Sequence, residues 1–242
     1  MASGTIWLKP GANETRSLQT NPPPKAVLYC REIKNEQIAM RKTNAAAFLD
    51  LVAGRRGHFR LESGHHGALW LDLDPLFAVP RRIAPFVHAL ANALRPHNVS
   101  VVCGPLLGGA FLAQLVSQAL DVEFCFTERA MSGQPGDLYR ARYLLPTAFV
   151  ARIEGTRVAI VDDVMSAGSA LRGSYAELQS HGAETVVAGA LLVLGSAGAS
   201  FFAEHDVPVE AAARDDYDLW LPADCPLCAR GLPLEDVAGV AS

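Results

Sequence analysis

The chain has 242 residues, of which 21 are basic and 25 acidic, so its formal net charge is −4. Half of the residues are hydrophobic and only 19% are charged. This composition excludes a disordered chain, which would lack the apolar surface that offsets the entropy of ordering. Because no basic block stands out, it also argues against nucleic-acid binding by bulk electrostatics.

The cysteine content and the hydropathy indicate the cellular compartment of the chain. The five cysteines are Cys30, Cys103, Cys125, Cys225 and Cys228. An odd number at low density argues against a disulfide framework. The first 20 residues contain no continuous apolar run of the kind a signal peptide needs. The most apolar stretch, Val186–Leu194, is far shorter than the roughly 20 residues that span a bilayer. We therefore expect a cytoplasmic protein with no membrane partner.

Residues 1–39 differ from the rest, with the proline run Pro22–Pro24 and no sustained periodicity. A flexible leader is the first interpretation. The alternative is an upstream extension of the true start, because Met40 stands at the boundary. We expect one domain over residues 40–215 and a C-terminal tail over residues 216–242.

From Thr43 onward the chain shows regular periodicity. Thr43 is suited to cap a helix. The segments Phe59–Leu61 and Leu69–Leu71 are typical of short strands around the turn Ser63–Gly67. Apolar residues then repeat at helical spacing from Ile83 to Leu94.

Apolar strands then alternate with amphipathic helices. The predicted strands are Val99–Cys103, Val122–Phe126, Val158–Val161, Val186–Leu194 and, last, Val207–Val209. The predicted helices are Phe111–Ala119 and Leu171–Leu178, the second closed by Gly182. This alternation predicts an α/β fold with a parallel central sheet flanked by helices. Such sheets bind ligands beyond the carboxyl ends of their strands.

The strongest motif follows the strand Val158–Val161. Two acidic residues, Asp162 and Asp163, lead into the run Ser166-Ala-Gly-Ser169 at a helix start. Free backbone N–H groups and serine hydroxyls there suit a phosphate monoester. The carboxylates lie too near that phosphate to hold it, and are better placed to accept the hydroxyls of an attached ribose. The alternative is an acidic first turn that caps an ordinary helix.

This segment resembles the phosphoribosyl diphosphate signature of type I phosphoribosyltransferases, above all the orotate-specific form Asp-Asp-Val-x-Thr-Ala-Gly-Thr-Ala. Here both threonines are serines, which keeps the hydroxyls. The resemblance covers residues 43–194. Gly57–Gly64 and Leu69–Leu71 are similar to the family's Phe-x-Leu-x-Ser-Gly segment and its aromatic-containing strand. It implies a small N-terminal hood beside the central sheet, and the tail here carries a CxxC pair.

Two further segments match the family. The loop Cys103–Gly109 looks like its diphosphate-binding loop, where backbone amides would bind the leaving group together with Mg²⁺. The alternative is a turn followed by a close-packed helix. Arg129, in Phe126-Thr-Glu-Arg129, matches the strand exit where an arginine meets the diphosphate.

The resemblance implies Mg²⁺-dependent displacement of diphosphate from the ribose by a base nitrogen, through an oxocarbenium-like transition state. The leading acceptor is orotate, a substrate of pyrimidine biosynthesis, and the products are a nucleoside monophosphate and diphosphate. The implied phosphoribosyl diphosphate-binding residues are Asp162, Asp163, Val164, Met165, Ser166, Ala167, Gly168, Ser169, Ala170, Gly104, Pro105, Leu106, Leu107, Gly108 and Arg129. The expected catalytic residues are Asp162, Asp163, Arg129, Arg140 and Arg142, and the expected base-binding residues are Ser166, Leu69 and Trp70.

The polar stretch Thr127–Arg142 is expected to form a lid that excludes water, the alternative being an ordinary surface loop. The family carries a Lys-x-x-Lys-Asp-His-Gly-like run here, whereas Ala130–Asp137 has neither lysine nor histidine. Losing one transition-state charge contact typically costs on the order of 10²–10³ in rate. Arg140 and Arg142 are candidates to replace that charge, including across the interface of the homodimer that the resemblance implies.

The expected base site also departs from the family. Glu62 stands where the family places a lysine, and Gly195–Gly198 replaces an Asp-Arg motif that pairs with the orotate carboxylate. His65 and His66 are either base contacts or histidines without a role. Three hypotheses follow: an orotate enzyme, an enzyme with another acceptor base, or a non-catalytic regulator that binds phosphoribosyl diphosphate or a nucleotide. A response-regulator fold is disfavoured, because its acid pair falls on an early strand.

The tail contains the pair Cys225-Pro-Leu-Cys228. A structural zinc site needs four ligands, so this pair would need His205, His181 or the same pair from a second subunit. The alternatives are a redox pair and two thiols without a role.

Overall fold

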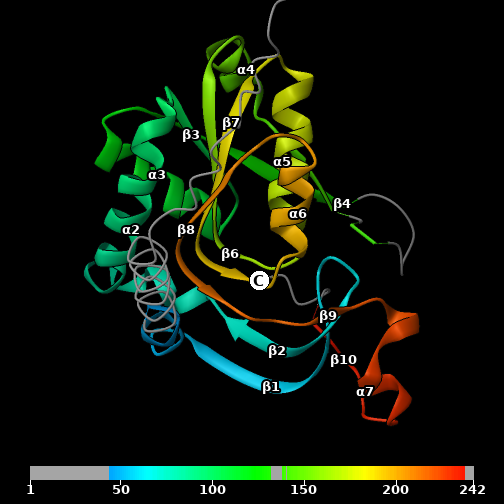
Figure 1. Ribbon diagram of the computed structural model, residues 1–242. Helices are drawn as coiled ribbons and strands as arrows, with labels where there is room; N and C mark the ends of the chain where they lie inside the picture. Colours follow the sequence, from blue (N-terminus) through cyan, green and yellow to red (C-terminus); the bar gives the residue numbers. More distant parts are fainter. Residues whose placement is uncertain (1–43, 132–137, 140, 238–242) are drawn as a thin grey trace, which may run out of the picture. The chain divides into compact units, whose positions relative to one another are not determined.

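The computed structural model describes residues 44–131, 138–139 and 141–237 (Figure 1). The chain divides into two units, Met1–Gln37 and Ile38–Ser242, and all described residues lie in the second. The leader predicted over residues 1–39 and the helix cap at Thr43 therefore lie outside the described residues. The helix itself occupies residues 44–49.

A six-stranded sheet forms the centre, in the order β5-β4-β3-β6-β7-β8. All neighbouring strands are parallel except β5, which runs antiparallel to β4 at one edge. The strands are β3 (Val101–Pro105), β4 (Glu123–Met131), β5 (Ala141–Leu144), β6 (Arg157–Met165), β7 (Glu184–Leu194) and β8 (Val209–Asp215). The predicted α/β fold with a mostly parallel sheet is thereby confirmed.

Helices cover both faces of this sheet. Figure 1 shows α2 and α3 over one face and α5 and α6 over the other. The helices are α2 (Pro80–Leu94), α3 (Gly108–Leu120), α4 (Thr147–Ile153), α5 (Ser169–Ser180), α6 (Ala197–Ala203) and α7 (Pro226–Ala229), with 3-10 turns η1 (Asp74–Ala78), η2 (Arg95–His97) and η3 (Pro222–Asp224). No helix in the described part of the chain combines the length and the apolar character needed to cross a bilayer.

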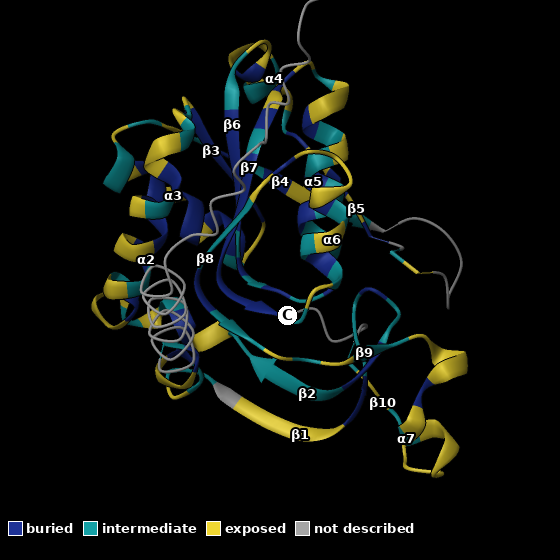
Figure 2. Cartoon of the chain, in the orientation of Figure 1, coloured by how far each residue is buried: buried dark blue, intermediate teal, exposed yellow. Residues whose placement is uncertain are grey.

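The two covered faces explain the continuous apolar strands of the sequence. Val158, Ala159, Ile160 and Val161 of β6 are each 0% exposed, because alternate side chains enter the cores on opposite faces. Figure 2 shows the central strands in dark blue for the same reason. The buried β6 and β7 thereby give a rigid base to the loops at their carboxyl ends.

A second sheet has the order β10-β1-β2-β9. Its core is the antiparallel hairpin of β1 (Ala53–Arg60) and β2 (His66–Asp72). The C-terminal strands β9 (Leu219–Trp220) and β10 (Glu235–Asp236) pair with β2 and β1. We call this sheet the hood. Residues 216–242, which were expected to form a tail, thus supply two strands that pair with a hairpin far away in the sequence.

Several element boundaries differ from the predictions. The stretch expected as a lid begins and ends in strands, because Thr127–Met131 continues β4 and Ala141–Arg142 belongs to β5. The middle of that stretch, residues 132–137 and 140, lies outside the described residues. The last strand of the main sheet is β8, which starts at Val209 where the prediction ended. Short α4 and α6 were not predicted, because each is too brief to show a period.

A core substitution tests this packing. Leu90 of α2 is 0% exposed and packs between the helix and the sheet. We expect Leu90→Ala to lower the free energy of unfolding by about 2–5 kcal/mol, through lost apolar burial and a residual cavity. Urea denaturation measures the change. As the control, Leu144→Ala removes a side chain from a residue that is 46% exposed and should stay within about 0.5 kcal/mol of wild type. Equal losses in the two variants would contradict the assignment of the core.

Candidate functional site

A cleft of about 250 Å³ opens where β3 and β6 end. The loop after β3 forms one wall and the loop after β6 forms the other. The lining residues are Glu62, Leu73, Pro105, Leu106, Leu107, Gly108, Gly109, Tyr143, Asp162, Asp163, Val164, Ser166, Gly168, Ser169 and Ala170. We call this hollow the main cleft. The two loops singled out in the sequence therefore meet at one site, as the carboxyl ends of neighbouring parallel strands require.

A second hollow of about 270 Å³ adjoins the main cleft and is roofed by the hood. It is lined by Leu61, Glu62, Ser63, Leu69, Trp70, Leu71, Leu73, Val164, Ser166, Ser169, Leu194, Tyr217 and Val237. We call it the hood pocket. All three residues expected to bind a base, Leu69, Trp70 and Ser166, lie in its wall. Because Ser166 and Ser169 line both hollows, one extended ligand can occupy the two together.

The carboxylates of Asp162 and Asp163 lie at the floor of the main cleft, still within β6 rather than after it. Asp163 is 8% exposed. Burial raises the pKa of Asp163 to about 6, against the opposing effect of the Val164 N–H, which donates to Asp163 Oδ1 over 2.7 Å. Burial, and then repulsion from Asp163, also raises the pKa of Asp162. Desolvated carboxylates of this kind gain from a ligand that donates hydrogen bonds to them.

The loop after β3 packs closely against these carboxylates. A side chain at Gly109 would bring its Cβ to 2.8 Å from Asp162 Oδ1, and one at Gly108 would meet Asp163 Oδ2. The Leu106 N–H donates to the Thr127 carbonyl over 2.8 Å, which ties the loop to β4. The peptide bond between Leu106 and Leu107 is cis. Only glycine at these two positions lets the start of α3 approach β6 so closely.

The loop after β6 divides its residues between the cleft and the core. Ser166, Ser169 and Ala170 face the cleft, whereas Met165 and Ala167 are 0% and 1% exposed and pack inside. Gly168, with φ of 73°, is the N-cap of α5. The first N–H groups of α5 therefore lie beside the serine hydroxyls, an arrangement suited to an anion. Of the other expected ligand residues, Gly104 is buried in β3 and does not line the cleft.

Arg129 is held beside the cleft by an acidic neighbour. Its Nη2 lies 3.7 Å from Glu62 Oε2. The opposite residue in the β4–β5 register is Tyr143, whose hydroxyl donates to Glu62 Oε1 over 2.8 Å. Burial, followed by the Glu62 charge, raises the pKa of Tyr143. Sequence reasoning missed Tyr143, because only the pairing of β5 with β4 brings it to Glu62.

The other expected cations take different places. Arg142 is exposed on β5, on the face opposite to its buried neighbours Ala141 and Tyr143. Arg140 lies outside the described residues. Among the described residues that line the two hollows, none is a lysine or an arginine. Both hollows are therefore acidic in their side chains.

The two neighbouring histidines His65 and His66 make different contacts. His65 Nδ1 lies 3.2 Å from Ser63 Oγ, and its ring contacts Tyr139 at 5.6 Å. His66 is buried and belongs instead to a cluster with His58, Cys225 and Cys228. Neither of the two histidines expected to complete the cysteine pair lies in this cluster. His181 faces Glu177, and His205 donates to the Phe201 carbonyl. His58, which does contact the pair, gave no signal in the sequence, because 167 positions separate it from Cys225. The option of a second subunit's pair stays a prediction.

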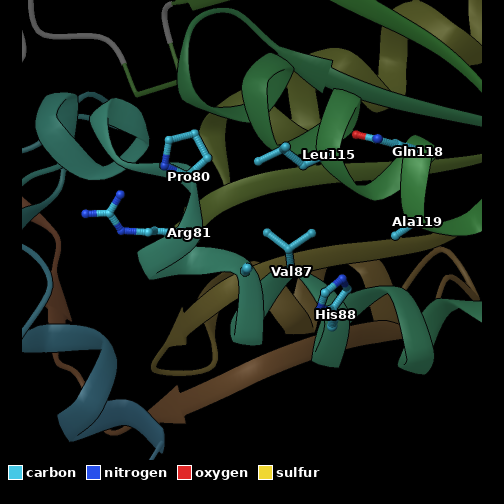
Figure 3. A pocket seen from close by; sticks show the side chains of 8 residues that line it. Pro80, Arg81, Val87, His88, Leu115, Gln118 and Ala119 are labelled. Carbon is cyan, nitrogen blue, oxygen red and sulfur yellow. The ribbon is translucent and has the colours of Figure 1, made fainter.

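A third hollow lies away from the strand ends. A groove of about 430 Å³ runs between α2 and α3, lined by residues that include Arg81 and His88 (Figure 3). Its lining contains no carboxylate or hydroxyl group that could engage a ribose. The paired acids, hydroxyls and backbone amides all gather in the main cleft, which is therefore the candidate site.

Comparison with known families and sequences shows which proteins this chain is similar to. The family model described as "Phosphoribosyl transferase domain" matches residues 74–213, more than half of the chain. The chain is 33% identical to an orotate phosphoribosyltransferase of Carboxydothermus hydrogenoformans over 189 residues, which are 77% of this chain and 92% of the relative.

Solved structures share the fold. An orotate phosphoribosyltransferase from Aeropyrum pernix matches with a TM-score of 0.51 and 21% identity, over 73% of this chain and 92% of that one. An adenine phosphoribosyl transferase from Trypanosoma brucei, in complex with AMP, pyrophosphate and ribose-5-phosphate, matches with a TM-score of 0.55 and 13% identity, over 71% and 79%. At these identities the likeness concerns the fold alone.

The raised pKa of Asp163 has a measurable effect on stability. Its folded pKa of about 6 exceeds the ordinary 3.8. The part of the free energy of unfolding that the protonated carboxyl contributes is therefore fully present below pH 3.8 and is lost as pH rises through about 6. Asp163→Asn keeps a neutral group at every pH. We expect the substrate-free variant to exceed wild type by up to about 3 kcal/mol at pH 7.5 and to match it near pH 4. Urea denaturation at both pH values measures this, with exposed Asp216→Asn as the control. A variant less stable than wild type at pH 7.5 would overturn the prediction.

Proposed function

Because this chain belongs to the phosphoribosyltransferase family, we propose that it transfers the phosphoribosyl group of phosphoribosyl diphosphate to a base nitrogen in the main cleft, with orotate as the first candidate acceptor. The C–O bond to the diphosphate breaks and a C–N bond to the base forms. The observation that carries this proposal is the meeting of Asp162–Asp163 with two amide-rich loops at one strand edge. Orotate comes from the names of the curated relatives.

The ribose end of the donor is assigned to the loop after β6. The 5′-phosphate would accept hydrogen bonds from the hydroxyls of Ser166 and Ser169 and from the first N–H groups of α5. Asp162 and Asp163 would accept from the two ribose hydroxyls. Their raised pKa values mean that burial disfavours the charged carboxylates, and donated hydrogen bonds would offset this cost. The sugar would thereby be held at a fixed distance from the acceptor, which lowers the entropic part of the barrier.

The diphosphate is assigned to the loop Pro105–Gly109. Its oxygens would face a wall that offers backbone amides and, in the described residues, no lysine or arginine. A divalent cation fits this charge pattern, because three carboxylates line the cleft, and among its described lining residues only backbone N–H groups and hydroxyls favour an anionic ligand. Mg²⁺ held there through the diphosphate would stabilise the charge that grows on the leaving group. Arg129, beside Glu62, is the side-chain cation assigned to that charge.

The acceptor base is assigned to the hood pocket. Leu69 and Trp70 of β2 form an apolar wall, and Ser166 is shared with the donor loop. A planar base stacked there would present its nitrogen toward the ribose in the adjoining cleft. The homodimer and the cytoplasmic location expected from the sequence remain predictions.

Diphosphate release tests the proposal. The full chain is incubated with phosphoribosyl diphosphate, Mg²⁺ and a panel of bases that includes orotate, uracil and adenine. We expect base-dependent release, and a fall of kcat/KM by at least about 10² in Asp163→Asn, whose side chain accepts ribose hydroxyls less well. Asp216→Asn, exposed and outside the cleft, is the matched control. Donor binding without turnover would favour a non-catalytic regulator, and absence of donor binding would overturn the assignment.

One observation favours a second acceptor class. The hood pocket contains the Glu62 carboxylate and, among its described lining residues, no cation that could pair with the carboxylate of orotate. Arg129 lies outside this lining, and its Nη2 is 3.7 Å from the Glu62 carboxylate, which partly offsets its charge. A neutral base would avoid this repulsion. The second candidate is therefore phosphoribosyl transfer to an uncharged base.

Glu62→Gln distinguishes the two acceptor classes. The substitution removes the negative charge and keeps an oxygen that accepts from the Tyr143 hydroxyl. We expect the ratio of kcat/KM for orotate to that for uracil to rise about tenfold, because repulsion of the orotate carboxylate disappears. Glu204→Gln changes an exposed acidic residue at the C-cap of α6 and should leave the ratio unchanged. A ratio that stays constant in Glu62→Gln would show that Glu62 does not face the base.

A further inference from the structure

Four side chains with metal-ligating atoms converge at the edge of the hood, outside both hollows. They are His58, His66, Cys225 and Cys228, and their ligand atoms all lie within 4.8 Å of one another. The first three are 5%, 2% and 3% exposed. We propose that this cluster binds one Zn²⁺ ion tetrahedrally and that the ion holds the C-terminal segment against the hood hairpin.

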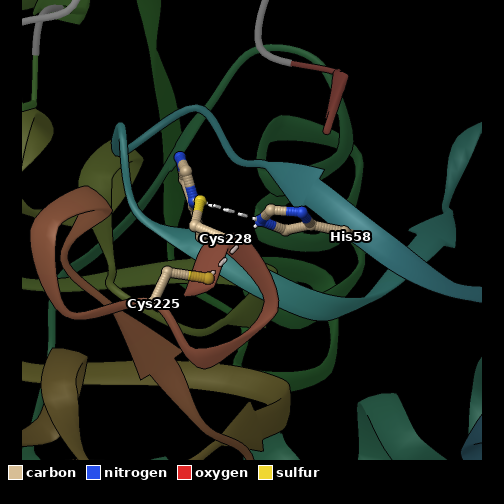
Figure 4. A group of neighbouring side chains, drawn as sticks. His58, Cys225 and Cys228 are labelled. Carbon is tan, nitrogen blue, oxygen red and sulfur yellow. Dashed lines mark hydrogen bonds between the residues drawn. The ribbon is translucent and has the colours of Figure 1, made fainter. Parts of the chain in front are cut away.

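Four of the distances between these atoms lie close to those of a tetrahedral site, and the whole set fits within 4.8 Å. A zinc ion with ordinary bond lengths separates two nitrogens by about 3.3 Å, and a nitrogen from a sulfur by about 3.6 Å. Here His58 Nε2 and His66 Nδ1 are 3.1 Å apart. His58 Nε2 lies 3.4 Å from Cys225 Sγ and 3.6 Å from Cys228 Sγ, and His66 Nδ1 lies 3.3 Å from Cys228 Sγ. Figure 4 shows both sulfurs directed toward the ring of His58.

The tautomer of His58 also fits a ligand. Its Nδ1 lies 2.9 Å from the carbonyl oxygen of Leu232, which can only accept, so Nδ1 carries the proton. Nε2 then presents its lone pair to the centre of the cluster. A carbonyl that holds the second ring nitrogen in this way is the usual support of a metal-bound histidine.

The ligand types select the metal. Two thiolates and two neutral imidazoles in tetrahedral array are the donors of structural zinc sites, whereas magnesium prefers oxygen. The two thiolate charges balance those of Zn²⁺, so the loaded site is neutral and suited to burial. All four positions are filled by protein, which leaves no coordination site for substrate. The role is therefore structural.

The position of the cluster shows which segments of the chain the ion would join. His58 lies beside the bulge of β1 and His66 begins β2, so the two flank the turn that carries Glu62 and Ser63. Cys225 is the N-cap of α7 and Cys228 lies within this short helix, between the C-terminal strands β9 and β10. These strands contribute only two residues each to the hood. One ion that joins residues 170 positions apart would stabilise the hood where its backbone pairing is weakest.

Metal content is the first test. The full chain, purified without a tag or a chelator, should hold about one zinc per chain by mass spectrometry of the metal. Cys228→Ser and His66→Gln should fall below about 0.2 per chain and melt about 5–10 °C lower. Cys125→Ala in β4 of the main sheet and His205→Gln in the turn after α6 are matched controls and should keep the metal. Wild type that stays below about 0.2 after incubation with Zn²⁺ and gel filtration would overturn the proposal.

The visible spectrum of the cobalt-loaded wild-type protein tests the metal site even if the variants do not fold. Wild-type protein stripped of zinc and loaded with Co²⁺ should show the strong visible bands of tetrahedral cobalt together with thiolate charge transfer. A weak octahedral spectrum, or a Cys225–Cys228 disulfide in place of bound metal, would contradict the assignment.

Hydrogen exchange tests the structural role independently of catalysis. Removal of zinc should increase amide exchange in residues 53–72 and leave β6 and β7 unchanged. Unchanged exchange in the hood after complete removal of the metal would show that the ion does not hold it.

Discussion

The desolvation of two adjacent carboxylates in β6, just beyond its buried centre, is the constraint on which the candidate site depends. Asp162 and Asp163 continue β6, whose preceding residues are 0% exposed, so they cannot withdraw into solvent without disturbing the sheet. Their raised pKa values record the cost of that position. A protein tolerates such a cost where a ligand offsets it, and the ribose hydroxyls assigned to them would do so. The glycines of the opposite loop keep the cleft narrow enough for both walls to reach one donor molecule.

The acceptor side of the site depends on a different kind of structure. The hood pocket combines β2, the loop after β6 and C-terminal residues such as Tyr217, whose hydroxyl donates to the Leu69 carbonyl over 2.9 Å. The proposed donor side is therefore made of local loops on a rigid sheet, and the proposed acceptor side is made by association of distant segments. An adenine phosphoribosyl transferase shares the fold of the central sheet. If the hood pocket receives the base as proposed, the few polar groups of its described lining would select it, and Glu62 is the charged one among them.

The proposed zinc site also joins distant segments of the chain. The β1–β2 hairpin carries the turn with Glu62 and Ser63, yet a two-stranded hairpin by itself is only marginally stable. Here β9 and β10 extend it by short pairings, and the His58–His66–Cys225–Cys228 cluster lies between those pairings and the hairpin. A metal at that point would give the acceptor pocket a rigidity that the hydrogen bonds of the hood supply only in part.

The sequence by itself determined the parallel α/β core and the donor loops. A run such as Val158–Val161 is fully apolar only where both faces are buried, and the motif from Asp162 to Ser169 is continuous along the chain. The tertiary structure alone decided which distant groups meet. It brought Tyr143 to Glu62 through the pairing of β5 with β4, and His58 to Cys225 through the closure of the hood. Local periodicity carries information about neighbours within a few residues, whereas these contacts join positions 81 and 167 apart. Their pairing is set by packing free energy summed over the whole fold, which no local pattern records.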